Sequence, residues 1–140
     1  MTDDSVALAT NEQDDVSTSN GSTSNGSTGG GGSIAQRIAA GMTSIYKEHL
    51  GRGPMKVRTT LHENMVVTVL ADSLTKAELT LIAHGEGDGV RSMRRKMQEA
   101  MERDMRKLIE IQLHRETVCL LSDHCPKPDY AVEVLLLAPR

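Results

Sequence analysis

The spacing of the hydrophobic residues changes along this chain, and these changes limit the possible folds more than any other feature. Between residues 34 and 50 the apolar side chains recur at the spacing of an α-helix: Ile34, Ile38, Met42, Ile45 and Leu50. From Met55 the spacing becomes two, and a second run of strand-forming residues extends from Met65 to Ala71. We therefore expect a helix over about 34–50, ended by Gly51 and Pro54, followed by a β-hairpin.

The second half of the chain repeats this alternation of helix and strand patterns. Thr75-Lys76-Ala77-Glu78 has the pattern of a capping box and predicts a short helix ending at Gly85, before a flexible elbow over 85–89. A long helix is expected from about Val90 to His114, with one continuous apolar stripe: Val90, Met93, Met97, Met101, Met105, Leu108 and Ile111. Strand patterns over 116–122 and 130–138, joined by a loop over 123–129, complete the order α-β-β-α-α-β-β.

This order predicts a single α+β domain over residues 34–140. Two hairpins, with helices before and between them, favour a four-stranded, mostly antiparallel sheet with the helices packed on one face. Residues 1–33 differ in composition, because they are acidic, rich in Gly, Ser, Asn and Thr, and contain few large apolar groups. Such a segment buries too little apolar surface to offset the cost of ordering its backbone, so a disordered tail is expected there.

The charge distribution excludes some classes of function. The first 33 residues hold five of the 19 acidic residues and none of the 16 basic ones, so the expected domain is close to neutral. A dedicated nucleic-acid-binding protein usually has a strongly basic face, and we expect no nucleic-acid partner. The longest uncharged apolar run is far shorter than the ~20 residues that span a bilayer. The sequence therefore predicts a cytoplasmic protein without a membrane-spanning segment.

The apolar strands predict self-association. Phe and Trp are absent and Met occurs eight times, so the core must be built from smaller or more flexible side chains. The strands over 65–71 and 130–138 are apolar at nearly every position, whereas a half-solvated strand alternates with polar residues. This pattern indicates that both faces of the sheet are covered. We expect a homodimer that buries sheet or helix surfaces between its subunits.

The first candidate site is the loop Gly51-Arg52-Gly53-Pro54 with the basic residues that follow it. Arg52, Lys56 and Arg58 together have the charges to bind a phosphate, a nucleotide or a carboxylate. The alternative is that Arg52 complements the carbonyl groups at the C-terminal end of the first helix. The loop lacks the Gly-Lys-Ser/Thr ending of a phosphate-binding P-loop, so both interpretations stay open.

The second candidate site is Ser122-Asp123-His124-Cys125, followed by Asp129. It contains the residue types of a nucleophilic site, and a hydrolase using His124 with Asp123 is one hypothesis. Neighbouring strand residues point to opposite faces, however, so Asp123 and His124 are equally explained as structural groups at the end of the sheet. No spacing typical of a metal site is present around Cys119 and Cys125, and neither a metal nor a cofactor is predicted.

Several of these segments together resemble the small MpsC-like bacterial family, a domain of unknown function. The resemblance covers about Ile34 to Pro139 and is carried by short motifs: Gly51-Arg52-Gly53-Pro54 with Lys56 and Arg58, Leu74-Thr75 with Glu78, Met93-Arg94-Arg95, Leu121-Ser122-Asp123-His124 with Asp129, and Ala131-Val132-Glu133-Val134. This chain lacks aromatic residues that the family is expected to have near Met97 and Leu136.

The family name links it to sodium-translocating, membrane-potential-generating systems, and no established catalytic residues can be carried over from it. The resemblance implies a non-catalytic accessory or regulatory protein, linked to cation or inorganic-carbon transport and peripheral to the membrane. Its partner would be a membrane transport complex. The residues proposed to bind that partner or a ligand are Arg52, Lys56, Arg58, Asp123, His124 and Asp129.

Overall fold

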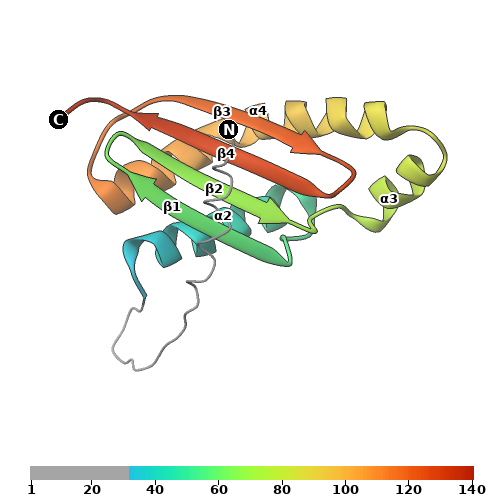
Figure 1. Ribbon diagram of the computed structural model, residues 1–140, viewed down its shortest axis with the longest axis horizontal. Helices are drawn as coiled ribbons and strands as arrows, with labels where there is room; N and C mark the ends of the chain where they lie inside the picture. The colour runs from blue at the N-terminus through green and yellow to red at the C-terminus, as the bar shows by residue number, and fades with distance from the viewer. Residues whose placement is uncertain (1–31) are drawn as a thin grey trace, which may run out of the picture. The chain divides into compact units, whose positions relative to one another are not determined.

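The computed structural model describes residues 32–140, and within this range the expected order of elements is confirmed. The elements are α2 (Ile34–Leu50), β1 (Lys56–His62), β2 (Met65–Ala71), α3 (Lys76–Ala83), α4 (Gly87–Leu113), β3 (Thr117–Cys125) and β4 (Tyr130–Leu137) (Figure 1). The predicted tail over residues 1–33 lies almost entirely outside the described residues. Ile34–Arg140 form one compact unit.

The four strands form one antiparallel sheet in the order β1-β2-β4-β3. Each hairpin pairs within itself, and the two hairpins join where β2 pairs with β4. Figure 1 shows α2 and α4 behind the sheet, so both long helices cover the same face. The predicted α+β fold, with a four-stranded sheet and helices on one face, is therefore confirmed.

The apolar core lies between the helices and the face of the sheet that they cover. Its centre consists of aliphatic and methionine side chains with one tyrosine: Ile38, Met42, Ile45, Tyr46, Val66, Leu70, Met101, Met105, Ile109, Ala131, Leu135 and Leu137. The two helices approach each other closely at Gly41, where an added Cβ would lie 2.5 Å from Cδ1 of Leu108. A side chain at position 41 would therefore displace Leu108, so the contact between α2 and α4 favours glycine there.

The ends of the first two helices follow the predicted local signals. Gly51 has a φ of 84°, which glycine adopts without steric cost, and its N–H donates to the carbonyl of Lys47 at 2.9 Å. At the start of α3, the Thr75 hydroxyl accepts from the N–H of Glu78, and the Glu78 carboxylate accepts from the N–H of Thr75. The predicted capping box is thus formed, and it fixes the entry into α3.

The start of α4 and its buried stripe differ from their predictions. The helix begins at Gly87, so most of the expected elbow over 85–89 is helical. Its buried residues are Val90, Arg94, Gln98, Met101, Met105 and Ile109, whereas Met93 and Ile111 of the predicted stripe are exposed. The reason is that Arg94 and Gln98 find polar partners on the facing elements, and a paired polar group can be buried at little cost.

β3 also extends further than predicted. It ends at Cys125 and not at residue 122, so Asp123 and His124 are strand residues paired with Val132 and Ala131. The connection to β4 is therefore short, and pairing between the two strands continues almost to the turn. The predicted loop over 123–129 is wrong in its first half.

The close approach at Gly41 predicts the effect of a larger side chain. Gly41→Leu places new atoms against Leu108, and such overpacking costs about 1–3 kcal/mol of stability. Gly89→Leu is the matched control, because an added Cβ at Gly89 in α4 would meet only the end of the Glu86 side chain, at an ordinary contact distance of 3.9 Å. Leucine also favours helices by up to about 1 kcal/mol over glycine. Urea unfolding of both variants measures the difference. Equal stability of the two variants would contradict a tight contact between α2 and α4.

Candidate functional site

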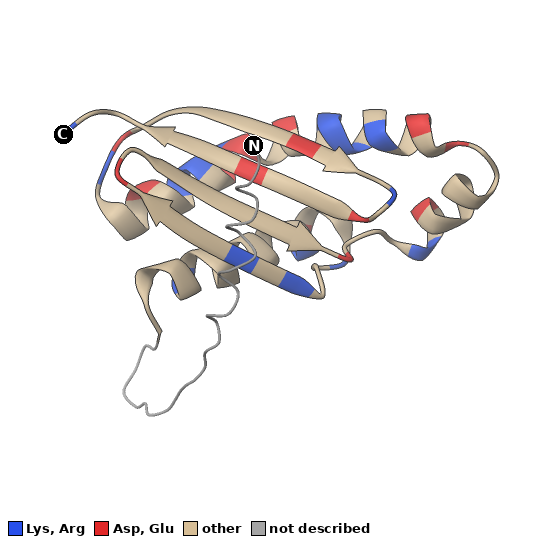
Figure 2. Cartoon of the chain, viewed as in Figure 1, with Lys and Arg blue, Asp and Glu red and all other residues tan. Residues whose placement is uncertain are grey.

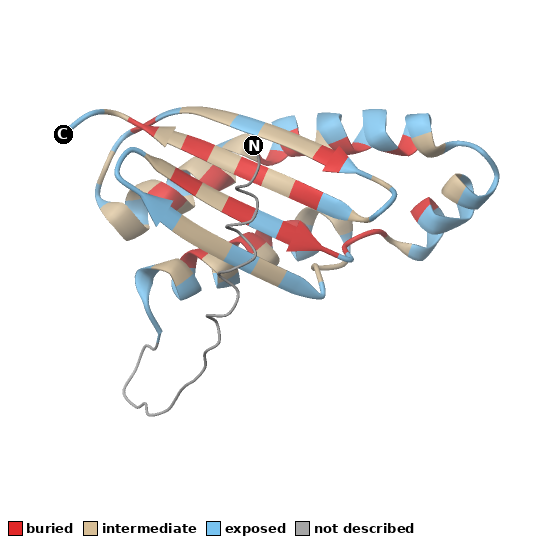
Figure 3. Cartoon of the chain, in the orientation of Figure 1, coloured by how far each residue is buried: buried red, intermediate tan, exposed pale blue. Residues whose placement is uncertain are grey.

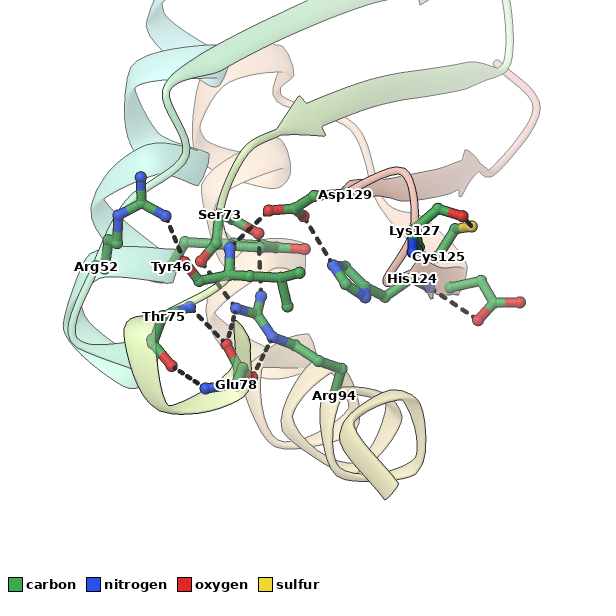
Figure 4. Close-up of polar contacts among 12 residues, drawn as sticks. Tyr46, Arg52, Ser73, Thr75, Glu78, Arg94, His124, Cys125, Lys127 and Asp129 are labelled. Carbon is green, nitrogen blue, oxygen red and sulfur yellow. Dashed lines mark hydrogen bonds and ion pairs between the residues drawn. The ribbon is translucent and has the colours of Figure 1, made fainter. Parts of the chain in front are cut away.

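Three of the six candidate residues meet around residues 72–75, the segment between β2 and α3 that we call the junction (Figure 4). Nη1 of Arg52 donates to the carbonyl of Leu74 at 2.6 Å, and Oδ2 of Asp129 accepts from the N–H of Leu74 at 2.8 Å. The other oxygen of Asp129, Oδ1, lies 3.1 Å from Nε2 of His124. These residues therefore hold the junction from the α2–β1 loop on one side and from the β3–β4 hairpin on the other.

A buried ion pair between α4 and α3 also contacts the junction. Nε and Nη2 of Arg94 donate to the two carboxylate oxygens of Glu78 at 2.7 and 2.6 Å, and Arg94 also donates to the hydroxyl and carbonyl of Ser73. Burial alone would raise the pKa of Glu78, but hydrogen bonds from Arg94 and Thr75 outweigh it and lower the pKa. Because both charges are buried, loss of either partner would leave the other uncompensated.

His124 is held in one protonation state by this arrangement. Its side chain has 0% exposure, and burial lowers its pKa despite the opposing hydrogen bond to Asp129. The neutral ring must donate from Nε2, since the Asp129 carboxylate can only accept. Nδ1 then carries a lone pair, and it has no hydrogen-bond partner within residues 32–140. The structure therefore stabilises neutral His124.

Asp123 lies at the edge of the sheet and interacts with α4. Its carboxylate accepts from Nη2 of Arg91 at 3.0 Å and from Nε of Arg95 at 3.4 Å, and it also accepts from the N–H of His124. The hydrogen bond from Arg91, followed by that from the His124 amide, lowers the pKa of Asp123 to about 2. This carboxylate is therefore ionised at neutral pH, and its side chain is 44% exposed.

The structure divides the predicted anion-binding residues between two places. The guanidinium of Arg52 is engaged with the junction. Lys56 and Arg58 occupy alternate positions of β1 and are both exposed, which places them on the outward side of that strand. Anion binding by all three residues together stays a prediction.

A second polar cluster, which we call the Glu133 cluster, was missed by sequence reasoning. Glu133 is fully buried, and its Oε2 accepts from Oη of Tyr46 at 2.5 Å and from Nε2 of Gln98 at 2.9 Å. Its Oε1 accepts from the hydroxyl of Ser122. All three donors are neutral groups, so burial raises the pKa of Glu133 above its ordinary value despite these hydrogen bonds.

One sequence signal for this cluster was present in the alternation of β4. Glu133 lies on the same side of β4 as Ala131, Leu135 and Leu137, all of which are buried. A period of two therefore places its carboxylate in the core, where it requires donors. The residues that would supply those donors cannot be identified from β4 alone, since Tyr46 is 87 positions away in the sequence.

The contacts of Ser122 and His124 bear on the hydrolase hypothesis. A serine nucleophile requires a hydrogen bond to its base, and the base requires a third group that orients it. Ser122 instead donates to Glu133, while His124 contacts Asp129. These contacts hold parts of the fold together, and none of them favours the hydrolase.

Three residues outside the predicted sites could together bind a metal ion. Ligand atoms of Glu48, His49 and Asp104 lie within 4.8 Å of one another where α2 meets α4, and Nε2 of His49 is 2.9 Å from Oδ2 of Asp104. The carboxylate of Asp104 therefore contacts α2. The cysteines considered from the sequence, Cys119 and Cys125, are not part of this group.

Comparison with known proteins identifies a family. A family model described as "Na+-translocating membrane potential-generating system (MpsC)" matches residues 31–139. The chain is also 32% identical over 80 residues to the uncharacterized protein YbcI of Bacillus subtilis (strain 168). That match covers 57% of this chain and 63% of YbcI, so the chain spans less than two thirds of this relative. No solved structure matches the chain. None of the helices within residues 32–140 is both long and apolar enough to cross a bilayer.

The buried neutral His124 predicts a loss of stability in mild acid. Its pKa is lower in the folded protein than the 6.5 of an unfolded chain, so the unfolded state binds more protons as the pH falls through this range. The contribution of His124 is present above pH 6.5 and is lost below it, by at most about 1.4 kcal/mol per pH unit. His124→Gln, which retains an N–H for Asp129, should flatten the decline between pH 7.5 and 5.5 in urea unfolding. His62→Gln on exposed β1 is the control, and parallel curves for wild type and His124→Gln would refute this account.

The Glu133 cluster predicts the opposite dependence on pH. Because the folded pKa of Glu133 is raised above 4.5, its contribution is present below that pH and is lost as the pH rises through the folded value. Glu133→Gln does not titrate, and its amide can still accept from Tyr46 and Gln98 while it donates to Ser122. The variant should gain stability relative to wild type between pH 4.5 and 8. Glu133→Leu leaves the hydroxyls of Tyr46 and Ser122 without this acceptor, at a cost of about 1–3 kcal/mol for each unpaired group, while Gln98 keeps its donation to the Asp123 carbonyl. A constant difference between wild type and Glu133→Gln over this range would contradict the raised pKa.

Proposed function

This chain belongs to the MpsC family, and we propose that it acts as a non-catalytic accessory or regulatory protein of a Na+-translocating, membrane-potential-generating system. In this role it lies in the cytoplasm, peripheral to the membrane, and binds a membrane-embedded transport subunit. The description of the family supports the link to such a system. The link to transport of cations or inorganic carbon is part of the proposal.

The observation that carries the non-catalytic role is the use of the polar residues inside the fold. His124 and Asp129 hold the junction together with Arg52, and the Arg94–Glu78 pair is buried behind them. A catalytic group must touch its substrate, whereas the side chain of His124 has no solvent-exposed surface. Groups of this kind stabilise a scaffold, and the function is then carried by the surface of that scaffold.

The exposed candidate residues are the ones proposed to contact partners. Lys56 and Arg58 on β1, and Asp123 on β3, point away from the junction and remain accessible. Charged residues at the edge of an interface increase the rate and specificity of association more than its affinity. We assign Lys56 to the contact with the membrane subunit. Self-association into a homodimer is a separate proposal, which the exposed surface of the sheet supports.

Affinity capture from native membranes tests this role. The tagged full chain, expressed in its own cells and mildly cross-linked, should recover a membrane-embedded cation-transport subunit. Deletion of its gene should lower the Na+-dependent membrane potential, and the wild-type chain should restore it. Lys56→Glu should recover less of the subunit, because it reverses the charge at the proposed contact.

Lys107→Glu is the matched control, since Lys107 is also exposed but lies on α4. It should behave as wild type. Capture without any transport subunit, together with an unchanged membrane potential in the deletion strain, would overturn the proposed function. Equal capture by Lys56→Glu and wild type would overturn only the assignment of Lys56.

A further inference from the structure

The sheet has a second face, turned away from α2 and α4, and this open face is largely apolar. Residues that pair across an antiparallel ladder share a face, so the register identifies its members. The apolar side chains of this open face are Met65, Val67, Val69, Val132, Val134 and Leu136 in the two central strands. They are flanked on β3 by Leu121, which is 57% exposed.

Burial along β4 separates the two faces clearly. Ala131, Glu133, Leu135 and Leu137 are buried beneath the helices, while the residues between them are only partly buried (Figure 3). No helix within residues 32–140 covers the open face in Figure 1. A solvated sheet face normally carries polar residues at alternate positions. A contiguous apolar face of this kind marks a surface that is covered in the working protein.

The charges on the open face are arranged at its two edges. One row crosses the sheet from Arg58 on β1, through Val69 and Val132, to Asp123 on β3. A basic residue therefore stands at one end of the row and an acidic residue at the other, with valines between them. Figure 2 shows the basic segments on β1 at one edge of the sheet and an acidic segment on β3 at the other.

We infer that a second copy of this chain covers the open face, packed sheet to sheet about a two-fold axis parallel to the strands. Rotation about this axis places β1 of each copy over β3 of the other. Arg58 then faces the partner's Asp123 twice, and the valines of the central strands meet at the centre. A two-fold axis across the strands would instead place β1 over β1, where the rows offer no acidic residue to Arg58.

This arrangement agrees with the known geometry of packed sheets. Two stacked sheets keep their strands within about 30° of parallel, and the rotation proposed here preserves the strand direction. Asp123 already accepts from Arg91, from Arg95 and from the N–H of His124, which use three of the about four acceptor positions of a carboxylate. One position on Oδ2 remains, and the side chain is 44% exposed. It therefore has the capacity to accept a further guanidinium from the open side.

The size of the open face is sufficient for a reversible dimer. Four strands about 4.8 Å apart, each of about seven residues at 3.4 Å per residue, give a projected area of roughly 450 Å². The relief of the side chains raises the accessible area above this value, towards the ~800 Å² that each partner buries in a specific interface. The inference rests on the proposed function only in the claim that this protein works through protein contacts.

The mass of the purified full chain in solution tests the inference. Sedimentation equilibrium from 1 to 100 micromolar should give twice the chain mass of 15.2 kDa, with Tm rising as the concentration increases. Val134→Lys places a charge at the centre of the open face and should give a folded monomer. Val118→Lys is the matched control, because Val118 is 54% exposed at the irregularity in β3, and it should remain dimeric.

A fallback substitution and a cross-linking variant test the same interface independently of Val134→Lys. If Val134→Lys fails to fold by circular dichroism, Val67→Lys replaces it, since Val67 pairs directly with Val134. His62→Cys should form a covalent dimer with the partner's Cys119 through a short bis-maleimide, because the two residues lie at opposite ends of one row of the sheet. Lys107→Cys on α4 should not. A monomeric wild type, or a Val67→Lys or Val134→Lys variant that remains dimeric, would overturn the inference, whereas failure of membrane capture would leave it standing.

Discussion

The buried ion pair between Arg94 and Glu78 is the interaction on which the arrangement of the elements depends. It joins α4 to α3 and, through the Ser73 carbonyl, to the segment that follows β2. Asp129 then fixes the next residue of that segment from the hairpin of β3 and β4. A buried ion pair adds little net stability over apolar packing, but it permits only one geometry in which both charges are satisfied. It therefore specifies how the short helix and the junction dock on the sheet.

The two faces of the sheet have different roles: the covered face forms the core of the fold, and the open face is the surface proposed for association. The covered face combines an apolar core with the Glu133 cluster, in which a carboxylate is satisfied by neutral donors from α2, α4 and β3. Such a cluster fixes how the helices are positioned on the sheet. Methionine and aliphatic side chains alone would specify this packing only weakly. The open face has no comparable polar group at its centre, and its valines are suited to contact with another apolar surface.

The fold was predictable because its signals are local. Helical spacing over 34–50, the capping box at Thr75 and the alternation of the strands each depend on residues close together in the sequence. The errors arose where a distant partner decides the outcome. Arg94 is buried because Glu78 and Ser73 face it, and β3 includes His124 because its pairing with β4 continues to the turn. Arg52, His124 and Asp129 were recognised as unusual polar residues, but their partners are backbone groups and one another.

By itself, the sequence determined the order of helices and strands and the apolar character of both faces of β2 and β4, because these follow from periodicity and composition. Its short motifs carried the resemblance to the family, which the match over residues 31–139 then showed. Only the tertiary structure decided which polar residues are buried together, and thus that His124 and Asp129 stabilise the junction. It also decided the strand order that places Arg58 and Asp123 at opposite edges of one row. The physical reason is that the burial of a polar side chain depends on the groups that face it across the fold. The spacing of residues along the chain does not identify those groups.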